Sequence, residues 1–451
     1  MTLIGCQVAH TPGTTQAVST AAPLDPVAVY AQAVAPYSLR KQHSYTVSRQ
    51  KHTKAAGQIF FEDSEQSVYM QNLGTEAFAG IADQTLQIGE NTIRISEQYK
   101  DGNAYFSVNQ GSFTAPMTAE SYISRYVPIA ALDPSLYQYA ALSEHGSCTR
   151  IGFAQPAGPE SWAMPAGAEF IDATAIVTLQ GLTKLICIDY SICYRYGNTE
   201  VTTRVKISPQ AGETVSFPRI DAESYTPLQT IDAPRILEQA CGYLLQASQL
   251  DAEYAENMDC KAFGINRTNS ANMTLSGTGN DFKAFLKSSI RQVNHSRNGE
   301  TTETTQAERF QNGTYVVATD GNPLQTDASV TADTMRAYCQ DILVSTIALP
   351  QYITGARMTQ TDSTFILDFT CSEALAEAIC SNVCQTLYNT PTLLHTLSTA
   401  HSTDIMTCYL EVDRYTGLPI RAGICYSAEH VIEGTAYQLS SQTDQTYSYP
   451  H

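Results

Sequence analysis

Two short segments of the 451-residue chain repeat one pattern, and this repeat constrains the fold more than any other feature. Residues 97–105 and 308–316 each contain an acidic residue, an aromatic residue, an Asp-Gly or Asn-Gly pair and a second aromatic residue. The glycine pairs supply the positive φ angles that a two-residue type I′ turn demands. The turns are 211 residues apart (313 − 102). The sequence therefore predicts equivalent hairpins in two copies of one structural unit.

The elements around each hairpin follow the same order. Thr118 and Thr331 come after the hairpins as hydroxyl N-caps of helices, 213 residues apart (331 − 118). Each copy opens with a helix, which begins with Pro26 in the first copy and near Pro234 in the second. We expect Pro36 to end the first of these helices.

Strands are expected in equivalent places of the two copies, followed by one long alternating strand in each. In the first copy the expected ranges are 45–49, 57–61, 67–72, 92–99 and 175–195. In the second they are 260–265, 272–277, 291–297, 302–310 and 404–427.

One helix is expected in the second copy alone. Ser372 caps it, and it runs to about residue 387, with Cys380 and Cys384 one turn apart on its core-facing side. The corresponding stretch of the first copy contains Pro156, Pro159 and Pro165, which would prevent a helix.

The repeat divides the chain into two domains, in agreement with a length too great for one ordinary core. We predict an N-terminal tether over residues 1–24, a first domain over 25–215, a linker over 216–233 and a second domain over 234–451. The fold class is α+β: two tandem copies of a curved antiparallel β-sheet, or half-barrel, each packed on helices.

The N-terminus resembles a bacterial lipobox, in which aliphatic residues and a glycine precede the cysteine that receives lipid. Leu3, Ile4, Gly5 and Cys6 form this pattern. Residues 7–24 contain no Asp, Glu, Lys or Arg and are rich in Ala, Thr and Pro, so we expect a flexible tether there. Only five residues precede Cys6, so we expect either a start assigned too late or a truncated chain. The prediction is an extracytoplasmic protein anchored to the bacterial cell membrane through lipidated Cys6.

The net charge argues against nucleic-acid binding, and the cysteine count excludes complete disulfide pairing. The formal charge is −18, so phosphate backbones are repelled and nucleic acid is not an expected partner. Twelve cysteines less Cys6 leave eleven, an odd number that cannot pair completely within one chain.

Motifs of the common enzyme classes are missing from the sequence. It contains no GxSxG nucleophile elbow, no phosphate-binding loop, no HExxH and no dinucleotide-binding glycine pattern. His395 and His401 with Asp404 do not complete a recognisable zinc ligand set. We therefore predict no catalytic residue, no metal and no cofactor.

The order and spacing of the elements resemble the lipoprotein-carrier (LolA-like) half-barrel family over nearly all of residues 26–449. The most specific piece is residues 409–421, which is similar to the strand, Asp, turn Gly, strand pattern common in those domains. The resemblance implies an antiparallel sheet curved around helices that enclose an apolar cavity. Some members of the family carry acyl chains there, whereas others sense envelope stress or present a surface.

Two functional hypotheses remain, with an enzyme as the least favoured third. The first is a membrane-anchored protein that binds a lipid or other apolar ligand in a half-barrel cavity. The second is an envelope structural or stress-sensing protein that binds partners through its surface. They differ in whether the inward-facing aromatic residues line a cavity or fill a core, and these candidates are Tyr105, Phe106, Phe113, Tyr315, Phe365 and Phe369.

Overall fold

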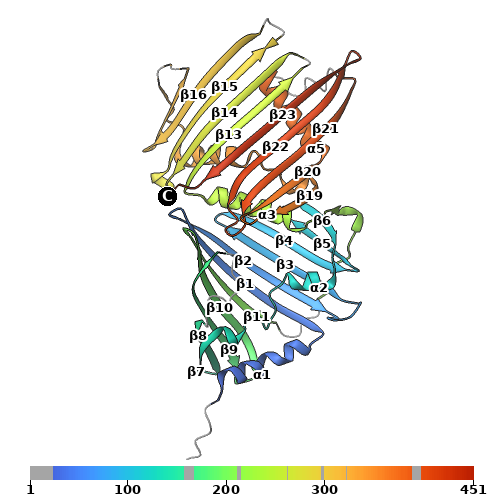
Figure 1. Ribbon diagram of the computed structural model, residues 1–451, viewed down its shortest axis with the longest axis vertical. Helices are drawn as coiled ribbons and strands as arrows, with labels where there is room; N and C mark the ends of the chain where they lie inside the picture. The colour runs from blue at the N-terminus through green and yellow to red at the C-terminus, as the bar shows by residue number, and fades with distance from the viewer. Residues whose placement is uncertain are drawn as a thin grey trace, which may run out of the picture.

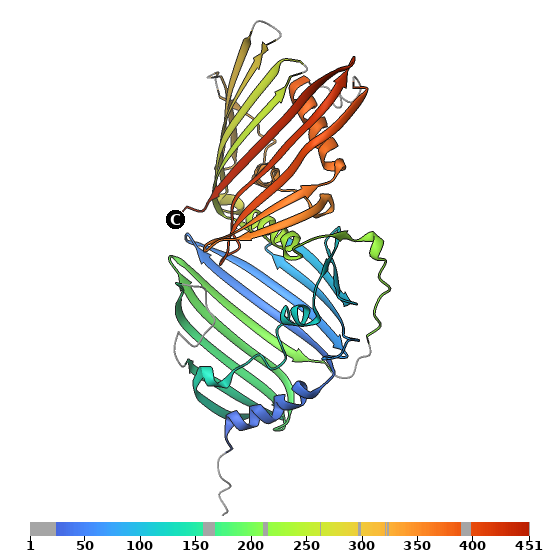
Figure 2. The same ribbon diagram turned by 45° about the vertical axis from the view of Figure 1, so that its right-hand side comes forward.

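Two large β-sheets stand end to end in the molecule, one from each half of the chain (Figures 1 and 2). The computed structural model describes residues 24–156, 167–210, 215–261, 263–295, 299–320, 322, 324–388 and 398–450. Helix α3 (Asp232–Gln246) lies at the junction between the sheets, and α1 (Pro26–Leu39) lies at the end of the first sheet that is farther from the second (Figure 1).

The first sheet has 12 strands in the order β12-β6-β5-β4-β3-β2-β1-β11-β10-β9-β8-β7. All neighbours pair antiparallel apart from β12, which pairs parallel with β6. Its strands are β1 (Gln42–Ala55), β2 (Gln58–Gln71), β3 (Ala79–Ile88), β4 (Asn91–Lys100), β5 (Asn103–Val108), β6 (Gly111–Pro116), β7 (Tyr137–His145), β8 (Cys148–Pro156), β9 (Glu169–Gln180), β10 (Lys184–Tyr196), β11 (Thr199–Pro209) and β12 (Thr226–Pro227).

The second sheet has 11 strands, all antiparallel, in the order β18-β17-β16-β15-β14-β13-β23-β22-β21-β20-β19. Its strands are β13 (Gln249–Cys260), β14 (Ile265–Ser276), β15 (Lys283–Asn294), β16 (Glu300–Gln311), β17 (Thr314–Thr319), β18 (Gln325–Thr326), β19 (Ile353–Gln360), β20 (Thr364–Cys371), β21 (Ala400–Asp413), β22 (Pro419–Ile432) and β23 (Thr435–Ser448). In the first sheet β1 pairs with β11, and in the second sheet β13 pairs with β23, so the predicted duplication is present in the topology.

The helices also follow the repeat. Helices α2 (Ala119–Ser124) and α4 (Ala332–Val344) begin at the predicted N-caps Thr118 and Thr331, whose hydroxyls accept bonds from the backbone three residues on. Helix α5 (Glu373–Tyr388) occurs where it was predicted in the second half. The equivalent proline-containing stretch after residue 156 of the first half lies outside the described residues.

Helix α1 differs from the prediction at its end and on its buried face. Asp25 caps it as expected, but the helix continues through Pro36 to Leu39. Proline lacks a backbone N–H and its ring crowds the carbonyl four residues earlier, yet helical geometry extends three residues beyond Pro36. The spacing of Val27, Tyr30 and Val34 predicts these residues as the apolar stripe, whereas the buried residues are Val29, Tyr30 and Ala33, so only Tyr30 of the stripe is buried.

The hairpin turns were predicted correctly, whereas several strand limits were wrong. Asp101 and Asn312 both have positive φ, at 50° and 53°. The expected strands 57–61 and 67–72 are one continuous strand, β2, and in the expected strand 260–265 residues 261, 263 and 264 lie in a turn between β13 and β14. The long strands expected over 175–195 and 404–427 each contain a turn, at Gly181 and Gly417, where φ is also positive.

One contiguous cluster of buried hydrophobic side chains includes residues of both sheets and of the helices. Among the six aromatic candidates, Phe106, Phe113 and Phe369 are buried, with at most 2% of their surface exposed. Tyr105, Tyr315 and Phe365 are half-buried. Packed aromatic rings of this kind form a core in the usual way.

Buried polar contacts fix the junction between the two halves. The Tyr243 hydroxyl on α3 donates a 2.7 Å hydrogen bond to the Glu62 carboxylate on β2. Lys51 on β1 donates to the backbone oxygen of Thr416 in the second half, at 3.1 Å. An unpaired polar group that is removed from water is costly. The Tyr243–Glu62 and Lys51–Thr416 hydrogen bonds therefore fix how the two halves meet.

Candidate functional site

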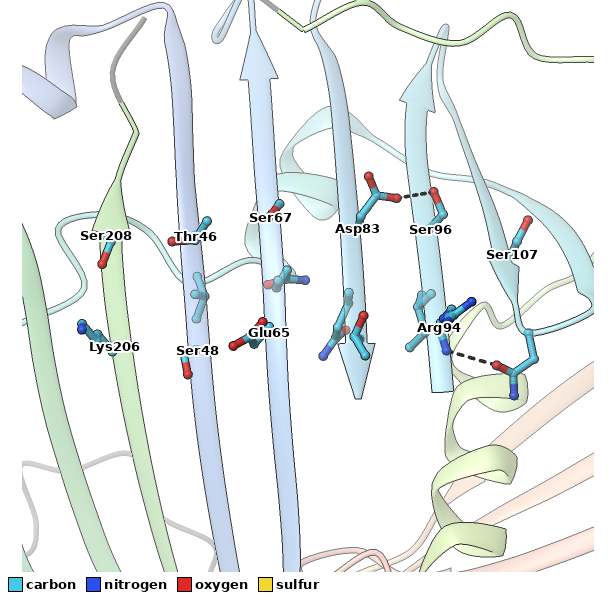
Figure 3. A pocket seen from close by; sticks show the side chains of 16 residues that line it. Thr46, Ser48, Glu65, Ser67, Asp83, Arg94, Ser96, Ser107, Lys206 and Ser208 are labelled. Carbon is cyan, nitrogen blue, oxygen red and sulfur yellow. Dashed lines mark hydrogen bonds between the residues drawn. The ribbon is translucent and has the colours of Figure 1, made fainter. Parts of the chain in front are cut away.

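A groove of about 680 Å³ crosses the solvent-facing side of the first sheet. Figure 3 shows its labelled side chains in two rows that run across the strands. The hydroxyl row consists of Ser208, Thr46, Ser67, Asp83, Ser96 and Ser107, and the charged row consists of Lys206, Ser48, Glu65, Thr85 and Arg94.

Strand register brings these residues together. Thr46 on β1 pairs with Ser208 on one side and with Ser67 on the other. Ser67 in turn pairs with Asp83. Adjacent strands are separated by about 4.8 Å, so each row presents one polar group at each such step. Two residues further along the strands, the charged row is aligned in the same way through the pairs of Ser48 with Lys206 and Glu65.

The local sequence explains why this face is polar. Val47, between Thr46 and Ser48 on β1, and Val68, next to Ser67 on β2, are buried in the core, with 4% and 2% of their surface exposed. Successive side chains of a strand point to opposite faces, so the intervening Ser, Thr and charged residues face solvent.

Part of the groove's hydrogen-bonding capacity is already used. Ser96 donates a 2.6 Å hydrogen bond to Asp83, and the backbone N–H of Arg94 donates to Asn109 at 3.1 Å. In the described part of the chain, the side chains of Ser48 and Ser67 make no such bond. Their hydroxyls can donate to a bound ligand and accept from it.

The charges in the groove balance, in contrast with those of the chain. Lys206 and Arg94 carry positive charge, and Glu65 and Asp83 carry negative charge. The whole chain has 26 Lys and Arg against 44 Asp and Glu. The groove is therefore suited to a polar ligand of little net charge. Its neutral lining repels anions less than the rest of this negatively charged protein does.

The second sheet has a smaller groove, of about 490 Å³, on its solvent-facing side. Ala255 on β13 pairs with Ser270 and with Asp444, and Ser270 pairs with Ser289. Here Arg421 binds Asp444 at its carboxylate and lowers the pKa of that group. The Arg421 contact thus already occupies one carboxylate of this groove.

The residues singled out in the sequence do not form a site in the described structure. Cys6 and His395 lie outside the described residues. Asp404 accepts a hydrogen bond from Gln438 at 3.0 Å. Cys380 and Cys384 are buried on α5, as predicted.

Sequence reasoning missed both rows of the groove. The signal is an alternation of polar residues two positions apart, as in Thr46 and Ser48, or Glu65 and Ser67. The same alternation occurs in any half-exposed strand. It indicates a site only when the register shows that the polar positions of neighbouring strands coincide.

The similarity of this chain to known proteins is confined to solved structures. No protein-family model and no curated protein matches the sequence. Among solved structures, the chain is similar to LprF from Mycobacterium bovis, with 9% identity, a TM-score of 0.26 and coverage of 43% of this chain and 96% of LprF. A DUF1329 family protein from Desulfovibrio piger has 8% identity, a TM-score of 0.20 and coverage of 42% and 96%. TM-scores this low do not establish a common fold.

Among the helices that the structure describes, each is too short or too polar to cross a bilayer.

Proposed function

We propose that this protein is a non-catalytic, extracytoplasmic binding protein, tethered to the membrane by lipidated Cys6, and that it binds a polar ligand in the groove of the first sheet. The observation that carries the proposal is the pair of aligned polar rows on an open sheet face, opposite a face that is packed. This corresponds to the surface-binding hypothesis.

A glycan is the ligand class that we propose. The hydroxyl row offers donors and acceptors on short side chains, which lose little conformational freedom when they bind. The charged row adds Lys206, Arg94 and Glu65, and Asp83 in the hydroxyl row balances the charge, so a glycan rich in hydroxyl groups and low in net charge meets complementary groups along the groove.

The tether position agrees with this arrangement. Helix α1, which follows the proposed anchor segment, lies at the end of the first sheet away from the second sheet (Figure 2). We propose that this end faces the membrane and that both sheets extend outward from it.

A glycan microarray tests the proposal. It should carry neutral hexasaccharides of glucose, N-acetylglucosamine and mannose beside acidic ones. We expect the full chain to bind one class and Ser67→Tyr to lose most of that binding, because a ring at the centre of the hydroxyl row blocks the groove.

Thr274→Tyr is the matched control, since Thr274 is exposed on the second sheet outside the smaller groove. Equal binding by wild type and Ser67→Tyr would show that the groove is not the site. Absence of binding to every glycan on the array would count against the ligand class.

The hypothesis of a lipid or other apolar ligand in a LolA-like half-barrel cavity stays a prediction. Its support is the resemblance in element order and the presence of two large antiparallel sheets with few helices. The buried aromatic residues on the inner faces give it less support than the grooves give to surface binding.

A further inference from the structure

Two cysteines on neighbouring strands of the second sheet lie close together. Phe369 on β20 pairs with Cys408 on β21. Cys371 is two residues beyond Phe369, so its side chain points to the same face of the sheet. The two Sγ atoms are 3.5 Å apart. A disulfide bond is about 2.05 Å long, so the sulfurs need to approach by about 1.5 Å.

We propose that Cys371 and Cys408 are an oxidisable pair, a modification site at which a low-molecular-weight disulfide converts the two thiols into one intramolecular disulfide. The site is separate from the groove and does not depend on the proposed function.

The two thiols differ in access. Cys371 is the last residue of β20 and is half-buried. Cys408 lies within β21 and has 2% of its surface exposed. An oxidant from solvent therefore reaches Cys371 first.

The pKa shifts of the two thiols also indicate that Cys371 reacts first. The hydrogen bond from the Cys408 thiol lowers the pKa of Cys371. The same contact, together with burial, raises the pKa of Cys408. Cys371 is thus the better source of thiolate, which is the nucleophile in disulfide exchange.

The reaction balances with an external disulfide as the oxidant. The Cys371 thiolate attacks one sulfur of the small disulfide, forms a mixed disulfide and releases one small thiolate. Cys408 then loses its proton and attacks the Cys371 sulfur, which expels the second small thiolate. Overall, two protein thiols are oxidised and one small disulfide is reduced to two thiols.

Nearby thiols are arranged less favourably. Cys380 and Cys384 have no exposed surface on α5. Their mutual contact and burial raise the pKa of Cys380. We therefore expect selective oxidation of the Cys371–Cys408 pair.

The test treats the folded full chain with oxidised glutathione and then blocks free thiols in denaturant. Digestion with Glu-C and Asp-N cleaves at Glu373 and Asp404, which separates Cys371, the α5 cysteines and Cys408. We expect a cross-linked peptide that joins Cys371 to Cys408 and a rise in Tm of several degrees. Cys148→Ser, in the first sheet, should behave like wild type.

Two variants make the outcome decisive. Cys371→Ser should form no cross-link and show no rise in Tm. Cys408→Ala should retain glutathione on Cys371, because the second thiol is missing. A cross-link between other cysteines, stable glutathione on Cys371 in the wild type, or no reaction at all would overturn the proposal.

Discussion

Glu97 on β4 and Glu308 on β16 occupy equivalent positions in the two sheets, and each accepts a 2.7 Å hydrogen bond from a tyrosine hydroxyl. Both glutamates are buried, with 7% and 5% of their surface exposed. Glu97 also forms a 3.2 Å ion pair with Arg125, and Arg125 contacts Asp232 at the start of α3. The repeated position has thus acquired a further role in the first half, where it connects the sheet to the junction helix.

Replacing these glutamates with glutamine should have unequal effects. Glu97→Gln leaves Arg125 with a weaker partner in a mostly buried site, and we expect it to lower the free energy of unfolding by about 1–3 kcal/mol. Glu308→Gln removes a carboxylate for which the described structure shows no arginine partner, so its cost should be smaller. Urea unfolding of both variants measures the difference, and an equal or reversed order would contradict this reading of the Arg125 contact.

Gln58 connects the halves through the backbone. Its side chain accepts hydrogen bonds from the N–H groups of Ser248 and Gln249 and donates to the Gln249 oxygen at 2.6 Å. Gln58→Ala should therefore lower the free energy of unfolding by about 1–3 kcal/mol. It should also allow the two sheets to unfold separately. Calorimetry should show one transition for wild type and for the exposed control Gln50→Ala, and a broadened or double transition for Gln58→Ala. A single unshifted transition in that variant would show that Gln58 does not couple the halves.

Glu238 on α3 predicts a pH dependence. Burial raises the pKa of its carboxyl, and a hydrogen bond from Asn109 opposes part of this effect. The folded state therefore retains a proton that the unfolded state loses above about pH 4.3, so this group's contribution to stability falls as pH rises through its folded pKa.

Glu238→Gln should remove that loss. The variant should gain stability over wild type as pH rises from about 4 to 7, with little difference at the acid end. Thermal unfolding across this range measures the gain, with the exposed Glu253→Gln as control. A difference that shrinks as pH rises would have the wrong sign for a buried carboxyl.

Cys6 is the anchor in the proposed function. Cys6→Ala, expressed in the native host, should move from the membrane fraction to the soluble fraction, since no acyl chain would be attached to that position. Fractionation followed by immunodetection checks this outcome. Membrane retention equal to that of wild type would sink the anchor hypothesis.

The sequence predicted those features that short segments determine. The Asp101 and Asn312 turns and the Thr118 and Thr331 caps depend on a few neighbouring residues, and all four were correct. Strand limits depend on distant contacts. Residues 62–66 have the composition of a loop, yet they lie within β2 because they pair with β1 on one side and β3 on the other.

The groove could not be predicted for a related reason. Thr46, Ser67 and Asp83 are separated in sequence by loops and turns, and only the pairing register aligns them. The nearness of Cys371 and Cys408 likewise follows from the pairing of β20 with β21. The alternation of residues along a strand predicts which of them are exposed. The residues that lie next to them on other strands are known only from the pairing register.

The most direct test of where this protein binds its ligand is native mass spectrometry of the full-length Cys6→Ala variant, purified without detergent and incubated with a lipid extract and then with the glycan selected on the array. Surface binding predicts no hydrophobic adduct, and a glycan adduct that Ser67→Tyr abolishes. A discrete hydrophobic adduct that survives in Ser67→Tyr and is removed by organic extraction would contradict the account and establish an apolar site in the interior.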